Sequence, residues 1–224
     1  MALRLPPFQP LPAPDAVGGD LLEVPLASLQ PTQLCVGMAE IRSRQQDFAA
    51  DSPKQRRSYL RRKPTPLVRS GAGELWMVDR HHRLRALMEL DPQATAFGYL
   101  ALELRERDRH EVLEQLHRRG WLYLYDGRGL GPQSPAALPR QLTGTQDDPY
   151  RSLVWKLKRE GVVAAAPLIP FHEFRWGAWL RSRTLPPFSS QRLEPALPAA
   201  RALARSQAAA HLAGWIGPAA PSPG

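Results

Sequence analysis

Hydrophobic residues in the first part of the chain occur in short runs and at helical spacing, and this pattern predicts strands and helices in alternation. Residues 21–26 form an apolar run that contains a proline, so we expect a strand at the edge of a sheet. Apolar positions among charged ones predict a helix over residues 37–50. A second helix is expected over residues 52–62, because the Ser-Pro pair that opens it is typical of a helix start.

A β-hairpin is predicted after these helices. Residues 66–69 and 74–78 are runs typical of strands, and they flank the glycine-containing segment 70–73. The second run leads directly into residues 79–83, and the apolar positions that follow have helical spacing. The pattern therefore predicts a strand, a sharp turn and a helix in close succession. Residues 99–104 are a further strand candidate.

The second half of the chain has a mostly helical pattern. An Asp-Pro pair at residues 148–149 is typical of an N-cap and a first helical position, and Gly161 is typical of the residue just past a helix end. We expect helices over residues 110–119, 148–159, 170–183 and 195–215. The expected fold class is α+β, with a small mixed-sheet domain followed by a mostly helical C-terminal part.

The expected organisation has four parts. Residues 1–20 carry five prolines and two adjacent glycines, so they are expected to form a flexible or extended arm. The mixed-sheet domain is expected over residues 21–106 and the helical region over residues 107–216. Residues 217–224 are expected to be a frayed tail.

The composition favours an anionic partner. The chain has 30 Lys+Arg against 21 Asp+Glu, and only four of the basic residues are lysines. The planar guanidinium of arginine suits phosphate and carboxylate, although a coding bias toward arginine explains the composition equally well. Residues 42–63 hold eight basic and two acidic residues. Such a run is usually a solvated face, and here it would also border the turn at residues 79–83.

Cys35 is the single cysteine, which excludes an intramolecular disulfide and a multi-cysteine zinc site. Its apolar neighbours favour a packing role over a nucleophilic one. The chain has no run of about 18 apolar residues, the length needed to cross a membrane. Prolines interrupt the N-terminal segment before an apolar run long enough for a signal peptide. We therefore expect a soluble, cytoplasmic protein with no membrane partner.

The turn at residues 79–83 is the main candidate site. A strand that turns directly into a helix directs unpaired backbone amides and the positive end of the helix dipole at one point, where phosphates bind readily. Arg80, His81, His82 and Arg83 are the expected phosphate-binding residues, and Asp79, His81 and His82 are the catalytic candidates. As an alternative, Asp79 would only cap the helix, and either histidine would only have a capping or packing role. Adjacent helical residues point about 100° apart, so no metal site is expected.

Residues 75–87 resemble the V-D-G-H-H-R-x-x-A-L signature of the ParB-like nuclease group, which belongs to the ParB/sulfiredoxin superfamily. Residues 24–26 and 31–37 are similar to the opening strand and the P-T-Q-x-x-V-G segment of that family. Residues 147–153 and 171–176 are similar to its D-D-P-Y-R-S-L and F-x-E-F-x-W segments, and residues 211–215 match as well. The resemblance covers residues 21–216.

The resemblance implies a ParB/sulfiredoxin-like fold with a site for a nucleotide or another phosphate ligand. It also implies a phosphohydrolase or phosphotransfer activity, with Mg²⁺ bridging the phosphates. Arg80 stands where the family usually has glycine, so it would either narrow the site or add a charge to it. His81 stands where sulfiredoxins have cysteine, so sulfinic-acid reduction is not expected. The serine-kinase branch has a carboxylate on an early loop, where this chain has Gln33 with Glu40 as the nearest acid.

Arg151 and Glu173 are secondary site candidates together with Gln33 and Glu40. A structural ion pair between Arg151 and Glu173 is the favoured interpretation, and a role near the phosphate turn is the alternative. Three functions stay open: nucleotide-phosphate binding with hydrolysis or transfer, nucleic-acid binding or nuclease activity, and a non-catalytic adaptor. The missing helix-turn-helix module and the missing acidic metal cluster count against the second function.

Overall fold

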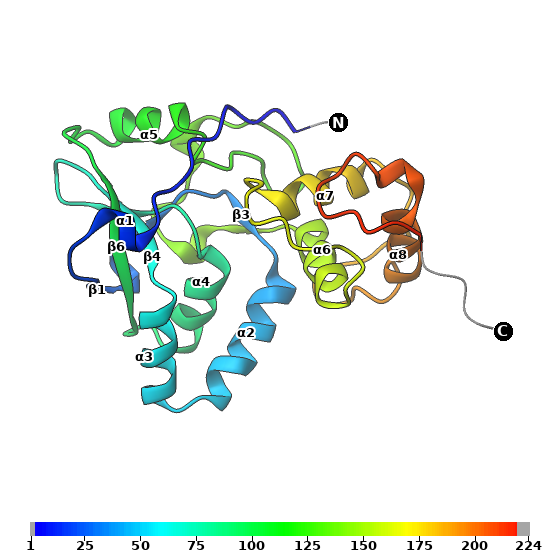
Figure 1. Cartoon of the computed structure of the whole chain (residues 1–224), viewed down its shortest axis with the longest axis horizontal. Coiled ribbons are helices and arrows are strands. Elements are labelled where there is room, and N and C mark those ends of the chain that lie inside the picture. Colours follow the sequence, from blue (N-terminus) through cyan, green and yellow to red (C-terminus); the bar gives the residue numbers. More distant parts are fainter. Residues whose placement is uncertain (1–2, 219–224) are drawn as a thin grey trace. The chain divides into compact units, whose positions relative to one another are not determined.

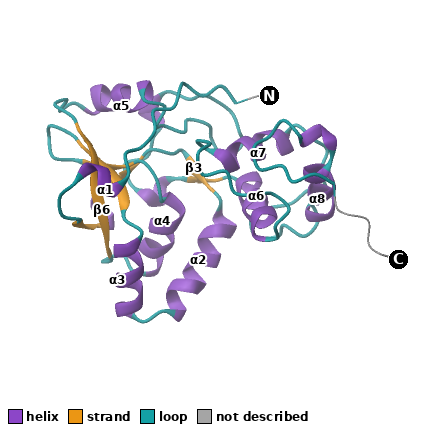
Figure 2. Cartoon of the chain, viewed as in Figure 1, coloured by secondary structure: helices purple, strands orange, loops and turns teal. Residues whose placement is uncertain are grey.

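The computed structural model describes residues 3–218, which form two compact units. The first, here called the sheet unit, comprises residues 4–36 and 41–146. The second, here called the helical unit, comprises residues 37–40 and 147–218 together with Leu3. The five-stranded sheet lies in the sheet unit, and α6, α7 and α8 form the helical unit (Figure 2).

The sheet of the sheet unit is mixed and has the strand order β1-β6-β4-β5-β2. β1 pairs antiparallel with β6 and β4 pairs antiparallel with β5, whereas β4–β6 and β2–β5 are parallel. β1 is an edge strand, as its proline predicts (Figure 1). The predicted hairpin is confirmed, and β6 begins four residues before the predicted start at residue 99. The strands are β1 (Leu22–Pro25), β2 (Leu29–Pro31), β4 (Thr65–Arg69), β5 (Leu75–Met77) and β6 (Thr95–Glu103).

The helices predicted around this sheet are confirmed. α3 lies against β6 and begins with a capping box, in which Ser52 accepts from the Gln55 amide and the Gln55 side chain accepts from the Ser52 amide (Figure 1). The side chain of Asp108 caps α5 by accepting hydrogen bonds from two backbone amides. The helices are α1 (Pro14–Val17), α2 (Met38–Ala50), α3 (Pro53–Arg62), α4 (His81–Leu90) and α5 (Arg109–Arg118).

Residues 107–146 pack with the sheet, although the sequence pattern places the change to the helical part near residue 106. The reason is the apolar face of α5, because Val112, Leu113 and Leu116 are buried in one cluster with Trp76 of β5. Three 3-10 helices accompany this unit: Leu26–Ser28, Pro135–Ala137 and Leu142–Gly144. β3 (Cys35–Val36) pairs with β7 (Gln146–Asp147) in a separate two-stranded sheet, and Cys35 is fully buried.

The proline-rich segment before β1 is mostly extended and hydrogen-bonded to the sheet unit. Gln9 exchanges two such bonds, donating its amide to the Arg119 carbonyl at 2.9 Å and accepting from Trp121 Nε1 at 2.7 Å. The Tyr99 hydroxyl donates to the Pro12 carbonyl at 2.9 Å. These contacts order the described part of the segment against the folded unit.

The helical unit contains α6 (Pro149–Arg159), α7 (His172–Arg181) and α8 (Leu197–Arg205). Asp148 caps α6 and Gly161 follows its end with φ +69°, as predicted. Phe174, Trp176, Trp179 and Leu180 are buried in this unit. Among the residues that the structure describes, no helix has the length and apolar character to cross a lipid bilayer.

The predicted helix over residues 195–215 is wrong in length. α8 ends at Arg205, because Ser206 is extended and its hydroxyl donates to the Leu203 carbonyl. A short 3-10 helix (Gln207–Ala209) follows. The last residues then cross α7, where the Ala213 carbonyl accepts hydrogen bonds from Trp176 Nε1 at 2.8 Å and from His172 Nε2 at 2.7 Å. Tertiary hydrogen bonds thus override the helical preference of the alanine-rich sequence.

Replacing Gly214 by alanine is expected to lower the free energy of unfolding by about 2 kcal/mol or more. Gly214 has φ +81°, and an added Cβ would lie 2.4 Å from the Ala164 carbonyl oxygen. Gly217→Ala is the matched control, because Gly217 has φ +85° but no atom within 4 Å of the added Cβ. Urea unfolding should show the larger loss for Gly214→Ala. Equal losses in the two variants would contradict the proposed clash.

Candidate functional site

The turn between β5 and α4 leads directly from the end of a strand into the start of a helix. Arg80 is the N-cap of α4 and adopts a left-handed conformation with φ 72° and ψ 14°. The first intrahelical hydrogen bond runs from the Leu84 amide to the Arg80 carbonyl at 3.0 Å. The amides of residues 81–83 precede that bond and so have no acceptor within the helix. The strand-turn-helix expected at residues 79–83 is therefore present, with the positive end of a helix dipole at its centre.

Asp79 lies directly before the N-cap and holds Arg80 in place. Its Oδ1 accepts from the Arg80 amide at 2.6 Å, and its Oδ2 lies 3.1 Å from Arg80 Nη1. Both side chains are partly exposed, so this ion pair contributes little to stability. The α4 cap has no side-chain hydrogen bond, so Asp79 fixes the strained turn instead of acting as the N-cap.

Arg83 is the most constrained cation of the turn. Only 9% of the residue is exposed, its Nη1 donates to the Lys63 carbonyl at 3.0 Å, and its guanidinium lies 5.0 Å from the centre of the Tyr59 ring. Burial lowers the pKa of the Arg83 guanidinium, and the positive charges of Arg80 and Arg44 lower it further. The charges of two further guanidinium groups therefore act on Arg83.

The segment 42–63, which holds the basic run, thus contributes to the surroundings of Arg83. Arg44 on α2 acts on Arg83 through its charge, and the Tyr59 ring and the Lys63 backbone carbonyl contact Arg83 directly. The sequence indicated the basic run as a whole but not which of its members reach the turn, because that depends on how α2 and α3 pack. The Nε atoms of Arg80 and Arg83 are buried and have no hydrogen-bond acceptor among the described residues.

His81 is buried beneath the turn, with 1% of the residue exposed. Its Nε2 accepts from the Thr32 amide at 3.0 Å, so the ring proton is on Nδ1. Burial lowers the pKa of His81 to about 3, and the charge of His82 contributes to the shift. A neutral, buried ring that accepts from a backbone amide positions the segment around Thr32.

The remaining candidate residues of the sheet unit, His82 and Gln33, are the sequence neighbours of His81 and Thr32. His82 is half-buried at the second position of α4, about 100° around the helix from His81. Gln33 directly follows Thr32 and is buried, and its Oε1 has no donor among the described residues. Thr32 Oγ1 donates to the Met77 carbonyl at 2.9 Å, which joins this segment to the end of β5.

Glu40, Arg151 and Glu173 lie together in the helical unit. Arg151 Nη2 is 2.8 Å from Glu40 Oε2, and each of these side chains is 6% exposed. Burial favours a lower pKa for Arg151, but Glu40 and then Glu173 outweigh it, so the pKa is raised. Glu173 forms its ion pair with Lys158. The predicted ion pair between Arg151 and Glu173 is therefore wrong. Arg151 pairs with Glu40, which the start of α2 brings close to it, and Glu173 pairs with Lys158.

The charge of Glu173 is stabilised by its neighbours. Burial alone would raise the pKa of this carboxyl, but Arg151 and Lys158 hold it at about 2. Asp148 is almost fully buried as well and pairs with Arg181 at 2.7 Å. The pKa of Asp148 is raised, because burial outweighs Arg181 and the helix amides that it caps. The acidic and basic groups of this cluster are thus mutually neutralised, which is typical of a structural network.

The described residues contain no cluster of three His, Cys, Asp or Glu side chains that would hold a metal ion. At the turn, Asp79 supplies the carboxylate, and both of its oxygens contact Arg80. Hard divalent cations require several oxygen ligands, so the residues of the turn do not fit a protein-held Mg²⁺.

Comparisons with known proteins agree with this architecture. The chain is similar to protein Atu1540 from Agrobacterium tumefaciens, whose crystal structure superposes with a TM-score of 0.76 and 27% sequence identity, over 89% of this chain and 99% of that one. A comparison with curated protein sequences gives no match. A family model described as "Putative ParB-like nuclease" matches residues 22–182, which include the turn, both histidines and the Glu40–Arg151 pair. The chain therefore belongs to the ParB-like nuclease family.

Proposed function

We propose that the sheet unit binds a nucleotide through its phosphates at residues 79–83. The observation that carries this proposal is the position of Arg83 in the first turn of α4, where burial and then the positive charges of Arg80 and Arg44 lower the pKa of its guanidinium. A phosphate placed there would accept from the first helix amides and relieve the repulsion between the guanidinium groups. Asp79 and His81 would support the site by holding the turn and the Thr32 segment.

A phosphoryl-transfer or hydrolysis reaction at this site would use the same groups. The amides and Arg83 would stabilise the negative charge of the transferring group. His82 is the half-buried histidine beside these amides, and it would exchange the proton with the attacking or leaving oxygen. No step of this proposal needs a protein-held metal ion.

Titration calorimetry with ATP, CTP and inorganic phosphate tests the binding. Arg83→Gln is expected to weaken the affinity by about tenfold to a hundredfold, because a charge-assisted hydrogen bond to phosphate is lost. Arg118→Gln removes the same charge from an exposed side chain of α5 and should leave the affinity within about twofold. Absence of binding, or equal affinity for the wild type and Arg83→Gln, would remove the proposal.

The variant Arg80→Gly distinguishes two effects of Arg80: the charge of its side chain and the strain of its left-handed backbone conformation. Glycine adopts φ 72° without a steric penalty, so the variant is expected to be about 1 kcal/mol more stable than the wild type. We expect it to bind phosphate about tenfold more weakly at the same time, because one guanidinium is lost. Tighter binding by the glycine variant would instead mean that Arg80 narrows the site.

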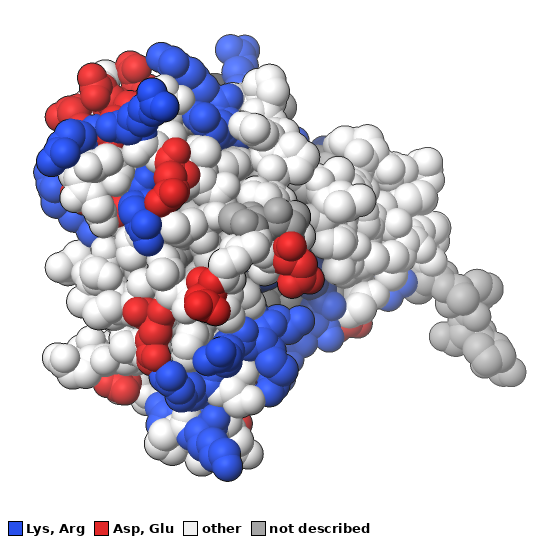
Figure 3. Space-filling view, turned by 60° about the vertical axis from the view of Figure 1, so that its left-hand side comes forward, with Lys and Arg blue, Asp and Glu red and all other residues white. Residues whose placement is uncertain are grey.

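A nucleic-acid backbone is a second candidate ligand, because α3 carries five basic residues and no acidic one along Pro53–Arg62. Lys and Arg side chains gather in the lower half of the face shown in Figure 3, where α2 and α3 lie. Binding of a DNA duplex that weakens steeply with salt and is lost in Lys54→Gln/Arg62→Gln would favour this candidate. A folded protein inert to nucleotides and to DNA would favour the adaptor role.

A further inference from the structure

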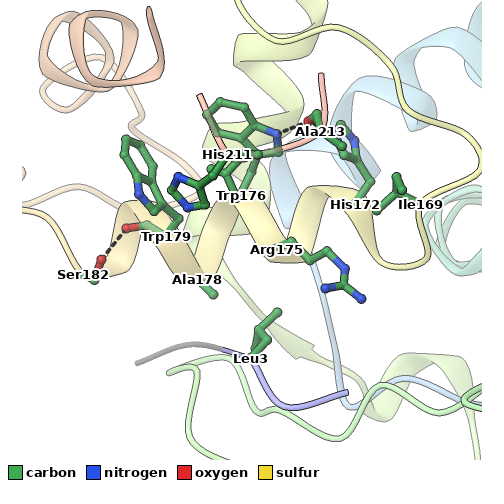
Figure 4. Close-up of a pocket in the computed structure, with 11 residues that line it drawn as sticks. Leu3, Ile169, His172, Arg175, Trp176, Ala178, Trp179, Ser182, His211 and Ala213 are labelled. Atoms are coloured by element: carbon green, nitrogen blue, oxygen red, sulfur yellow. Dashed lines mark hydrogen bonds between the residues drawn. The ribbon is translucent and has the colours of Figure 1, made fainter. Parts of the chain in front are cut away.

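A cavity of about 500 Å³ lies along α7 in the helical unit (Figure 4). Its size is within the range of sites for small organic molecules, about 300–1,000 Å³. Most of its walls are apolar or aromatic. The lining residues belong to α7 and the positions beside it, to the segment after α8 and to Leu3. The principal lining residues are Leu3, His172, Arg175, Trp176, Trp179 and His211.

One wall of the cavity is fixed by hydrogen bonds. The Ala213 carbonyl accepts from both Trp176 Nε1 and His172 Nε2, at 2.8 Å and 2.7 Å. The carbonyl oxygen of the next residue, Gly214, accepts a hydrogen bond from the Ala164 amide at 2.8 Å. Two side chains of α7 thus hold the crossing segment in position, so the cavity is largely preformed.

The aromatic groups of the cavity include a ring pair. The Trp179 and His211 rings lie 6.4 Å apart at an interplanar angle of 66° (Figure 4). Trp179 Nε1 is buried and has no hydrogen-bond acceptor among the described residues. An unsatisfied buried donor is destabilising, and a ligand oxygen within reach would accept its hydrogen bond.

Arg175 gives the cavity a positive charge. Its Nε donates to the Pro170 carbonyl at 2.9 Å, which anchors the guanidinium at one corner. Figure 4 shows this group extending from α7 on the side where Leu3 lies. None of the lining residues that the structure describes is acidic. The cavity therefore combines an apolar body, one planar cation and two histidines.

We propose that this cavity binds a small aromatic carboxylate. An aromatic body would pack against Trp176 and Trp179, and the carboxylate would meet the planar fork of Arg175. The single guanidinium and the apolar walls suit one carboxylate better than the several charges of a nucleotide. This site lies in the helical unit, and the proposed nucleotide site lies in the sheet unit, so the two proposals stand on different residues.

The test uses naphthalene-2-carboxylate and its neutral counterpart naphthalene-2-carboxamide, titrated against the full-length protein by calorimetry. The wild type is expected to bind the carboxylate at least about tenfold more tightly than the amide, because a charge-assisted pair is worth more than a neutral hydrogen bond. Addition of the carboxylate should shift the indole N–H resonances of Trp176 and Trp179 in the nuclear magnetic resonance spectrum.

Arg175→Gln is expected to abolish the preference for the carboxylate, and Arg175→Lys should keep part of it, because lysine retains the charge but not the fork. Arg192→Gln is the matched control, since Arg192 is an exposed arginine of the same unit outside the cavity. Arg83→Gln should bind the carboxylate as the wild type does. Absence of binding to the wild type, or an unchanged preference in Arg175→Gln, would overturn the proposal.

Discussion

Arg151→Met is expected to lower the free energy of unfolding by about 3–5 kcal/mol, because it leaves the Glu40 carboxylate buried without its partner. The two charged groups are 2.8 Å apart and both side chains are 6% exposed, so water does not compensate for the loss. Glu40→Met should also destabilise the protein, since the buried guanidinium of Arg151 then loses the carboxylate that it contacts and keeps only the more distant charges of Glu173 and Asp148. Urea unfolding of the two variants measures both effects.

The double variant Glu40→Met/Arg151→Met should recover most of that loss, because neither buried charge remains. Lys156→Met is the comparison for an ordinary surface pair. Lys156 lies 3.3 Å from Glu160 and its side chain is 37% exposed, so this change should cost less than about 1 kcal/mol. A double variant as unstable as the sum of the single ones would contradict the pairing, and so would a loss below about 1 kcal/mol in Arg151→Met.

The Glu40–Arg151 pair also shows why sequence reasoning found these residues but not their arrangement. The two residues are 111 positions apart, and a sequence pattern does not show which of two acids meets an arginine. The decisive contact is at Gly37, where an added Cβ would lie 2.9 Å from the Ser152 amide nitrogen. Only a residue without a side chain allows α2 to begin so close to α6, and this approach brings Glu40 to Arg151.

Two segments of the family resemblance meet at the same place. The Asp147 carboxylate accepts from the Met38 amide at 3.1 Å, and Ser152 Oγ accepts from the Ala39 amide at 3.1 Å. The D-D-P-Y-R-S-L segment therefore supplies acceptors for the first amides of α2. These side chains have a structural role, whereas the sequence alone could assign them to structure or to chemistry.

Local signals predicted the elements of the candidate turn well. The hairpin residues, the Ser52 cap of α3 and the apolar face of α4 each depend on neighbours within a few positions, so the sequence shows them directly. β2 escaped prediction because its three residues carry no pattern of their own and depend on pairing with β5. The role of His81 likewise depends on Thr32, which lies 49 positions earlier in the chain.

Acidification from pH 6.5 to pH 5 is expected to destabilise the sheet unit through His81. The pKa of this ring is about 3 in the folded protein, because the ring is buried next to His82. Its ordinary value in an unfolded chain is about 6.5. Between these two values the unfolded chain binds one more proton than the folded one, so stability falls as the pH falls. Above the unfolded value His81 contributes no pH dependence.

The slope from this one group is about 1.4 kcal/mol per pH unit, which amounts to about 2 kcal/mol at pH 5 and about 5 kcal/mol near pH 3. The carboxyl groups of Glu23 and Glu173, with pKa values of about 2, add to the loss only below about pH 4.5. The interval from pH 6.5 to pH 5 therefore separates the histidine from these acids.

His81→Gln isolates the effect, because the glutamine carbonyl can accept from the Thr32 amide at the place of Nε2 but does not titrate. Urea unfolding at pH 7, 6 and 5 should give a flatter dependence for the variant than for the wild type. The difference between the two curves should grow by about 1.4 kcal/mol for each pH unit below 6.5. Parallel curves would mean that His81 is protonated in the folded protein, and the ring would then be a cation of the turn, available to a phosphate.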